Sequence, residues 1–193
     1  MRGFWRGGGV FVAALLIGMS AQRVLAQASA AAVQVNPSQV LGNMIRNAES
    51  DAVSLAEAMP EEKYNFAPSQ SLFKVGETTE FKGVRTFVQQ VAHIAGWNYV
   101  FLQEMGFEKD KDAAAIEKLA TKAEALKALK ESFAAAEKAA ATITAQNAYE
   151  GLGPKKTMTR AASAGEIALH TMDHYGQMVV YARMCGIVPP SSR

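Results

Sequence analysis

Cysteine and long hydrophobic runs are scarce in this 193-residue sequence, and each scarcity excludes a class of protein. Cys185 is the only cysteine, so no intramolecular disulfide can form. It ends an apolar segment, and we interpret it as a small buried hydrophobic residue rather than a reactive thiol. The sequence also lacks a phosphate-binding loop, a nucleophile elbow and a dinucleotide fingerprint, so no motif identifies a substrate.

An excess of charge of one sign is missing as well. The chain has 20 Lys and Arg against 18 Asp and Glu. Loss of the first 26 residues would remove three arginines and no acid, leaving 17 basic and 18 acidic residues and a net charge of −1. Lysines gather between residues 109 and 130, but acids are mixed among them, which is typical of a solvated helix face; these acids are Asp110, Asp112, Glu117, Glu124 and Glu131. We therefore expect no nucleic-acid partner.

Residues 1–26 have the layout of a secretory signal peptide. Arg2 and Arg6 precede an apolar run from about Gly9 to Met19, and small residues lead to a cleavage site after Ala26. The run is short for a bilayer span, so a permanent anchor is the weaker interpretation, and no cysteine follows the site to carry a lipid. We expect a mature protein that starts near Gln27, is exported to the periplasm or secreted, and has no stable membrane anchor.

Apolar residues recur at helical spacing in four segments of the remaining chain, which favours one all-α domain over residues 27–193. The segments are about 38–59, 86–105, 118–144 and 161–185. Ser38 can cap the first, Pro60 ends it, and Gly106 and Gly186 are natural stops for the second and fourth. Four such helices predict a four-helix bundle, and the long connection after the first helix permits a crossover at the bundle end. The stretch "QNAYEGLGPKKTMT" reads as a loop.

Two of the chain's three histidines lie four residues apart in "EIALHTMDHYGQMVVY". On a helix this spacing places His170 and His174 on one face, as metal ligands require. His93, in "VQQVAHIAGWNYVF", joins them if the second helix faces the fourth. Taken alone, a histidine such as His93 on an apolar face is more often a hydrogen-bonded core or interface residue than a metal ligand.

Four other residues are candidates for the same site. Glu166 lies one turn before His170 and could act as a general base, bind the metal or orient His170, or could simply be an acid in the first turns of the helix. Gln177 continues the polar face. Trp97, one turn after His93, and Tyr181, two turns after His174, could line a pocket or pack in the core.

Three segments carry a resemblance to a known family: "MPEEKYNFAPS", "EFKGVRTFVQQVAHIAGWNYVFL" and "ALHTMDHYGQMVVYARMCGIVPPSSR". Together they resemble the DinB-like superfamily of four-helix proteins, which includes the YfiT-like group of metal-dependent hydrolases, and the resemblance spans essentially the whole mature chain. It implies that His93, His170 and His174 bind a divalent metal, most commonly zinc or nickel, with positions left open to water. Gln177 matches the glutamine that commonly follows the histidine pair.

The resemblance leaves two classes of function open. One is an enzyme: a hydrolase that activates water on the metal and acts on an unidentified small molecule, or a thiol S-transferase, which export disfavours because low-molecular-weight thiols are mainly cytosolic. The other is a non-catalytic metal-binding or dimerising module. The resemblance also allows a homodimer formed through bundle faces.

Overall fold

The computed structural model describes residues 35–76 and 80–193. The predicted signal peptide, residues 1–26, lies outside the described residues. The domain Asn36–Arg193 forms one compact unit. Among residues 35–76 and 80–193, no helix has both the length and the apolar character needed to cross a membrane.

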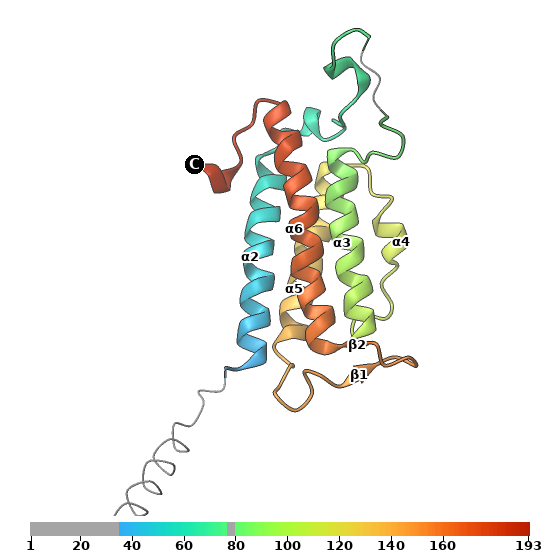
Figure 1. Cartoon of the computed structure of the whole chain (residues 1–193), viewed down its shortest axis with the longest axis vertical. Coiled ribbons are helices and arrows are strands. Elements are labelled where there is room, and N and C mark those ends of the chain that lie inside the picture. The colour runs from blue at the N-terminus through green and yellow to red at the C-terminus, as the bar shows by residue number, and fades with distance from the viewer. Residues whose placement is uncertain (1–34, 77–79) are drawn as a thin grey trace, which may run out of the picture. The chain divides into compact units, whose positions relative to one another are not determined.

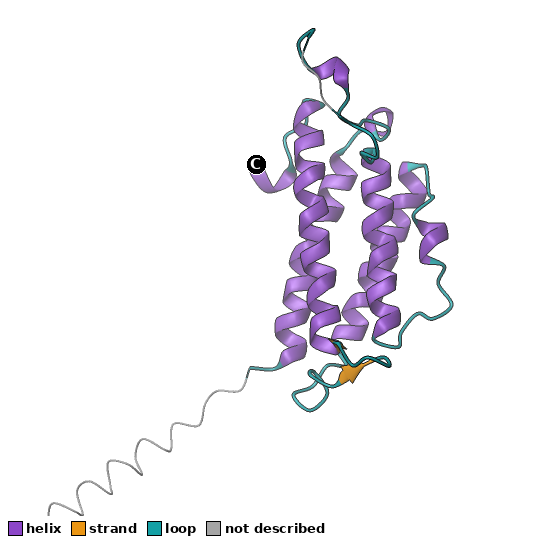
Figure 2. Ribbon diagram, turned by 45° about the vertical axis from the view of Figure 1, so that its right-hand side comes forward, coloured by secondary structure: helices purple, strands orange, loops and turns teal. Residues whose placement is uncertain are grey.

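Four long helices form the bundle, which confirms the predicted all-α fold (Figure 2). They are α2 (Pro37–Ala58), α3 (Phe87–Glu104), α5 (Lys122–Ala140) and α6 (Arg160–Met184). Both α2 and α3 pack against α5 and α6, so α2 and α3 occupy opposite corners of the bundle (Figure 1). Helices α2 and α6 run in one direction, and α3 and α5 run in the other (Figure 1).

The connection from α2 to α3 crosses the end of the bundle and holds the start of α3. It contains two 3₁₀ turns, Glu61–Lys63 and Gln70–Leu72. The backbone N–H of Phe87 donates to the Phe66 carbonyl at 2.9 Å, and that of Val88 donates to the Tyr64 carbonyl at 2.8 Å. These bonds satisfy N–H groups of the first helical turn, which have no partner within the helix. The crossover therefore fixes where α3 begins, and with it the height of His93 in the bundle.

A second long connection joins α3 to α5, because these parallel neighbours need a return path along the bundle. It carries the short helix α4 (Ala113–Ile116), whose cap is Asp112. The prediction of a third helix from residue 118 is wrong at its start. Thr121 caps α5, since its Oγ1 accepts from the Glu124 N–H at 3.3 Å, so the bundle helix begins only at Lys122.

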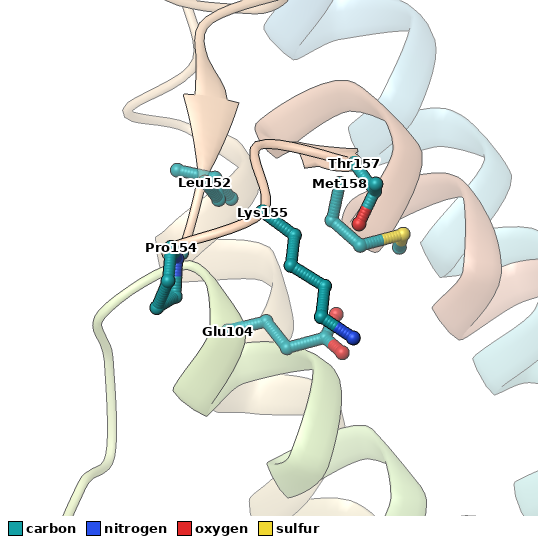
Figure 3. A pocket seen from close by; sticks show the side chains of 7 residues that line it. Glu104, Leu152, Pro154, Lys155, Thr157 and Met158 are labelled. Atoms are coloured by element: carbon teal, nitrogen blue, oxygen red, sulfur yellow. The ribbon is translucent and has the colours of Figure 1, made fainter.

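The segment between α5 and α6 contains a small antiparallel hairpin where the sequence predicted only a loop. Strand β1 (Gly151–Leu152) pairs with β2 (Met158–Thr159) in the register Gly151↔Thr159 and Leu152↔Met158. The hairpin and the end of α3 line a cavity of about 300 Å³ (Figure 3). Glu104 is the α3 residue in its wall.

The prediction that the third helix reaches residue 144 is also wrong, because α5 ends at Ala140. The other helix ends follow the sequence signals closely. Asn36 caps α2 by accepting from the Ser38 N–H at 3.1 Å, so the cap lies two residues before the predicted Ser38. Thr86 and Gln89 form a capping box at the start of α3. Gly106 and Gly186 adopt φ values of +91° and +81°, which confirms the two predicted glycine stops.

The core lies between the four helices and consists of large, fully buried side chains. Those with the greatest volume are Ile45, Leu55, Met59, Phe87, Ile94, Tyr99, Leu102, Leu129, Phe133, Ile143, Ile167 and Met178. One pair of acids also lies between helices: Glu49 of α2 faces Glu137 of α5. Burial, a hydrogen bond with Glu137 and the charge of Glu137 raise the pKa of Glu49 to about 7.

The raised pKa of Glu49 predicts how its replacement alters stability with pH. The carboxyl ionises near 4.5 when unperturbed and near 7 in the folded protein, so its stabilising contribution is lost as the pH rises between these values. Glu49→Gln should therefore gain stability relative to wild type on going from about pH 5 to about pH 8. Urea unfolding at both pH values measures this difference.

The matched control for Glu49 is Glu62→Gln, which removes an exposed carboxylate from the crossover. Its free energy of unfolding should differ from wild type by the same amount at both pH values. If the difference in free energy of unfolding between Glu49→Gln and wild type were also the same at both pH values, this would contradict a proton held between the carboxyl groups of Glu49 and Glu137.

Candidate metal centre

Three histidines meet where α3 packs against α6. His93 comes from the middle of α3, while His170 and His174 come from successive turns of α6. His93 and His174 are each 6% exposed, and His170 is half-buried. The ring centroids lie 4.6 Å apart for His93 and His174, 5.1 Å for His93 and His170, and 4.5 Å for His170 and His174. The structure thus brings all three predicted histidines into one cluster.

The imidazole nitrogens of this cluster converge as metal ligands do. One nitrogen from each of the three rings lies within 4.8 Å of the others, and His170 Nε2 is 3.2 Å from His174 Nε2. Zinc–nitrogen bonds of 2.0–2.1 Å in tetrahedral geometry separate two ligand nitrogens by about 3.3 Å. The donor set therefore fits a divalent ion with small side-chain adjustments.

Gln90 fixes the orientation of His174. The His174 Nδ1 and Gln90 Oε1 atoms are 2.6 Å apart, while Gln90 Nε2 donates to Gln177 Oε1 at 2.9 Å. Because the amide group of Gln90 is committed to Gln177, its oxygen must face His174 and accept from the Nδ1–H. The proton then resides on Nδ1, and the Nε2 lone pair points into the cluster.

Glu117, which lies outside the four-helix bundle, fixes the orientation of His93 in the same way. It follows α4 directly, and its Oε2 lies 2.9 Å from His93 Nδ1. A carboxylate accepting the Nδ1–H leaves Nε2 of His93 free for a metal and makes the imidazole a stronger donor. The interpretation of the charged segment 109–130 as only a solvated face is therefore incomplete, since Glu117 contacts the site.

Gly96 provides the space that lets α4 approach α3. A Cβ atom at this position would lie 2.8 Å from Glu117 Cγ and 3.0 Å from the Ala113 carbonyl oxygen. Both distances are shorter than van der Waals contact, so any side chain at Gly96 would push the α4 segment outwards. Because Gly96 has no side chain, α4 packs close to α3, and the Glu117 carboxylate lies beside His93, which is one turn before Gly96 on α3.

His170 differs from the other two histidines in its surroundings. Its ring packs against Trp97 and Phe101, at centroid distances of 5.4 and 5.9 Å. Its Nδ1 is buried and has no hydrogen-bond partner among the described residues. Glu166 therefore does not orient His170 through this nitrogen, although it lies one turn earlier on the same helix.

The histidine pair of α6 is neutral at physiological pH. Burial, together with the charges of the neighbouring histidines and Arg85, lowers the pKa of His170 to about 4. Burial and the charge of His93 lower the pKa of His174 to about 4 as well. Only neutral imidazole carries a lone pair for a metal, so the cluster can accept an ion at neutral pH without first losing protons from this pair.

The other predicted site residues fall at different distances from the cluster. Trp97 lies beside it, with its ring centroid 5.9 Å from that of His93. Gln177 hydrogen-bonds to Gln90, which in turn hydrogen-bonds to His174. Tyr181 is buried and packs edge to face on Phe66 of the crossover, at 5.8 Å, so its contacts are those of a core residue. Glu166 is half-buried, and its predicted role as a general base stays a prediction.

Two residues that hydrogen-bond to the histidines, Gln90 and Glu117, were not predicted, nor was the packing of Phe101 against His170. Gln90 had a usable signal, because it is a polar residue three positions before His93, and this spacing places both on one face of the helix. No pattern in the sequence around Glu117 indicated its contact with His93. Its contact depends on the path of the α3–α5 connection and on the gap at Gly96, which are tertiary features.

The chain matches a known family over most of its length. Residues 44–178 match the model of a family described as the DinB superfamily. This range covers well over half of the chain and includes all three histidines. The comparison with curated proteins finds no match.

The gap at Gly96 predicts a metal-binding defect. Gly96→Ala should move Glu117 away from His93 and weaken zinc binding about tenfold, the lower end of what loss of a ligand-orienting contact costs. Helix propensity favours alanine over glycine by about 1 kcal/mol, so α3 itself should remain intact. Competition with a chromophoric chelator measures the zinc affinity, and circular dichroism measures the helix content.

The control for this change is Gly176→Ala on α6, where an added Cβ meets no atom within 4 Å. This variant should bind zinc like wild type. Unchanged zinc affinity in Gly96→Ala would show that Glu117 does not support His93.

Proposed function

Because the chain belongs to the DinB superfamily and its three-histidine cluster allows metal binding, we propose that it is a metal-dependent hydrolase. The bound ion is divalent, and zinc or nickel are the candidates that the family resemblance implies, since three imidazole ligands also suit copper and iron. The substrate is a small molecule. The observation that carries the proposal is the composition of the cluster: three imidazoles, and no Cys, Asp or Glu ligand joining them within the described ranges.

Three protein ligands favour catalysis over a purely structural role. Structural zinc sites are closed by four protein ligands, whereas catalytic sites keep a position for water or substrate. When bound in such a site, a divalent ion acts as a Lewis acid and lowers the pKa of water towards neutrality. The imidazole arrangement described above is the one that supports this chemistry.

The surrounding residues have defined tasks in this proposal. Gln90 and Glu117 keep the protons of His174 and His93 on Nδ1, so that each ring presents Nε2 to the ion. Trp97 and Phe101 pack against His170 and limit its ring rotation. Glu166 on α6 is our candidate for a general base, because it is half-buried one turn before His170 and has a carboxylate that no other contact occupies among the described residues.

The proposal predicts about one metal ion per chain in the mature protein, residues 27–193, purified without a histidine tag. His93→Ala and His170→Ala should each reduce this content strongly, because a two-histidine site binds much more weakly. The matched control is Leu169→Ala, which alters an exposed side chain next to His170 and should keep the metal. Inductively coupled plasma mass spectrometry measures the content and identifies the ion.

Cobalt substitution then separates an enzyme from a structural module. In an open site, the absorption spectrum of the Co²⁺ protein should change on adding acetohydroxamate, which binds the metal directly. A spectrum that does not respond would indicate closed coordination and a non-catalytic role. A wild-type protein that stays empty after supply of zinc and nickel would remove both the metal and the hydrolase proposals.

Export is a separate part of the proposal and is supported by the N-terminal sequence alone. We predict that the protein recovered from the periplasmic or secreted fraction begins at Gln27. N-terminal sequencing or intact mass measures this directly. Recovery of the full-length chain in the cytosolic fraction would contradict it, whereas a membrane-bound full-length chain would indicate an uncleaved anchor.

A further inference from the structure

A second cavity adjoins the metal centre on the α4 side of α3. Its volume is about 280 Å³, and it is lined by Gly83, Val84, Arg85, Gln89 and Glu117. Glu117 belongs to both features, since the carboxylate that lines this cavity also accepts the hydrogen bond from His93. The volume is near the lower limit for ligand sites and suits a small molecule or one end of a larger one.

The side chains in this cavity offer mainly hydrogen-bond donors. Arg85 is half-buried and forms no ion pair or hydrogen bond with any residue in the described ranges, so its guanidinium is available to a ligand. The Gln89 oxygen accepts from the Thr86 N–H at 2.8 Å in the capping box, which leaves the amide N–H groups of Gln89 for the cavity. Glu117 is the one anionic group, and one of its oxygens is already committed to His93.

The charges around the cluster also favour an anionic ligand. Besides the histidines, the charged groups that act on the pKa of His174 are Asp173, Arg85 and Glu117, with a combined charge of −1. A divalent ion held by neutral imidazoles raises the local sum to +1. A ligand with one negative charge neutralises this sum, whereas a cationic ligand doubles it.

We propose that the substrates of the metal centre carry a compact oxyanion, a carboxylate or a phosphate, which Arg85 binds in this cavity beside the three histidines. This inference rests on the proposed function and adds a substrate class to it. The guanidinium suits the task because its planar N–H groups can donate two parallel hydrogen bonds to one carboxylate or phosphate.

The test uses hydroxamates as metal-binding anchors on the zinc-loaded mature protein. Succinic acid monohydroxamate carries a carboxylate tail, its terminal amide carries a neutral tail of the same size, and a phosphonate analogue supplies the second anion. Isothermal titration calorimetry measures each affinity relative to tail-less acetohydroxamate. We expect at least one anionic probe to bind about tenfold or more tightly than the amide, as a charge-assisted contact would give.

Arg85→Gln should reduce this preference to near unity while the zinc content stays at about one ion per chain. Lys82→Gln is the matched control, because it removes an exposed positive charge from the same loop without altering the cavity lining, and it should keep the preference. The stronger of the two anionic probes distinguishes a carboxylate from a phosphate substrate.

Equal binding of charged and neutral tails in the wild type would overturn the inference, as would an equal loss in Arg85→Gln and Lys82→Gln. Tighter binding of a probe with an amine tail would overturn it too, and would point to Glu117 as the recognition group. In each case, intact acetohydroxamate binding would leave the metal centre standing. A protein that holds no zinc would remove the proposed function and this inference together.

Discussion

The contact between α3 and α6 determines most of what is notable in this molecule, because it brings three imidazole rings together in a largely buried cluster. A protonated imidazole in this cluster would lose its hydration shell, and its positive charge would lie next to two other histidine side chains. Burial lowers the pKa of His170 and His174 to about 4, so this pair stays neutral, while Glu117 and Gln90 accept hydrogen bonds from the Nδ1 atoms of His93 and His174. The outward direction of the Nδ1 protons then directs the Nε2 lone pairs towards one point, so the same requirement that permits burial also builds a metal-binding geometry.

The fold serves this contact by fixing the height of the two helices. The crossover holds the first turn of α3, because the carbonyl groups of Tyr64 and Phe66 accept hydrogen bonds from its backbone N–H groups. Phe66 also packs on Tyr181 of α6. One segment therefore touches both helices that supply histidines. Tyr181 therefore contributes to the site through packing.

The sequence predicted the four bundle helices, most of their ends and the three histidines, because these depend on local spacing and capping. Apolar periodicity and signals such as Pro60, Gly106 and Gly186 act within a few residues. The short helix α4, the support of His93 by Glu117 and the importance of Gly96 could not be predicted, because each depends on how the α3–α5 connection returns along the bundle. The hairpin was missed for a simpler reason: strands of two residues are too short for alternation to show.

The position of α4 outside the four-helix core has a consequence for how such a site can diversify. Glu117 reaches His93 from a short peripheral segment, and the same residue forms part of the wall of the cavity that holds Arg85. Changes in this segment can alter the surroundings of His93 and the shape of the cavity without repacking the four long helices. The four-helix bundle can then stay constant between related proteins, while substitutions in the α3–α5 connection change the reactivity and selectivity of the site.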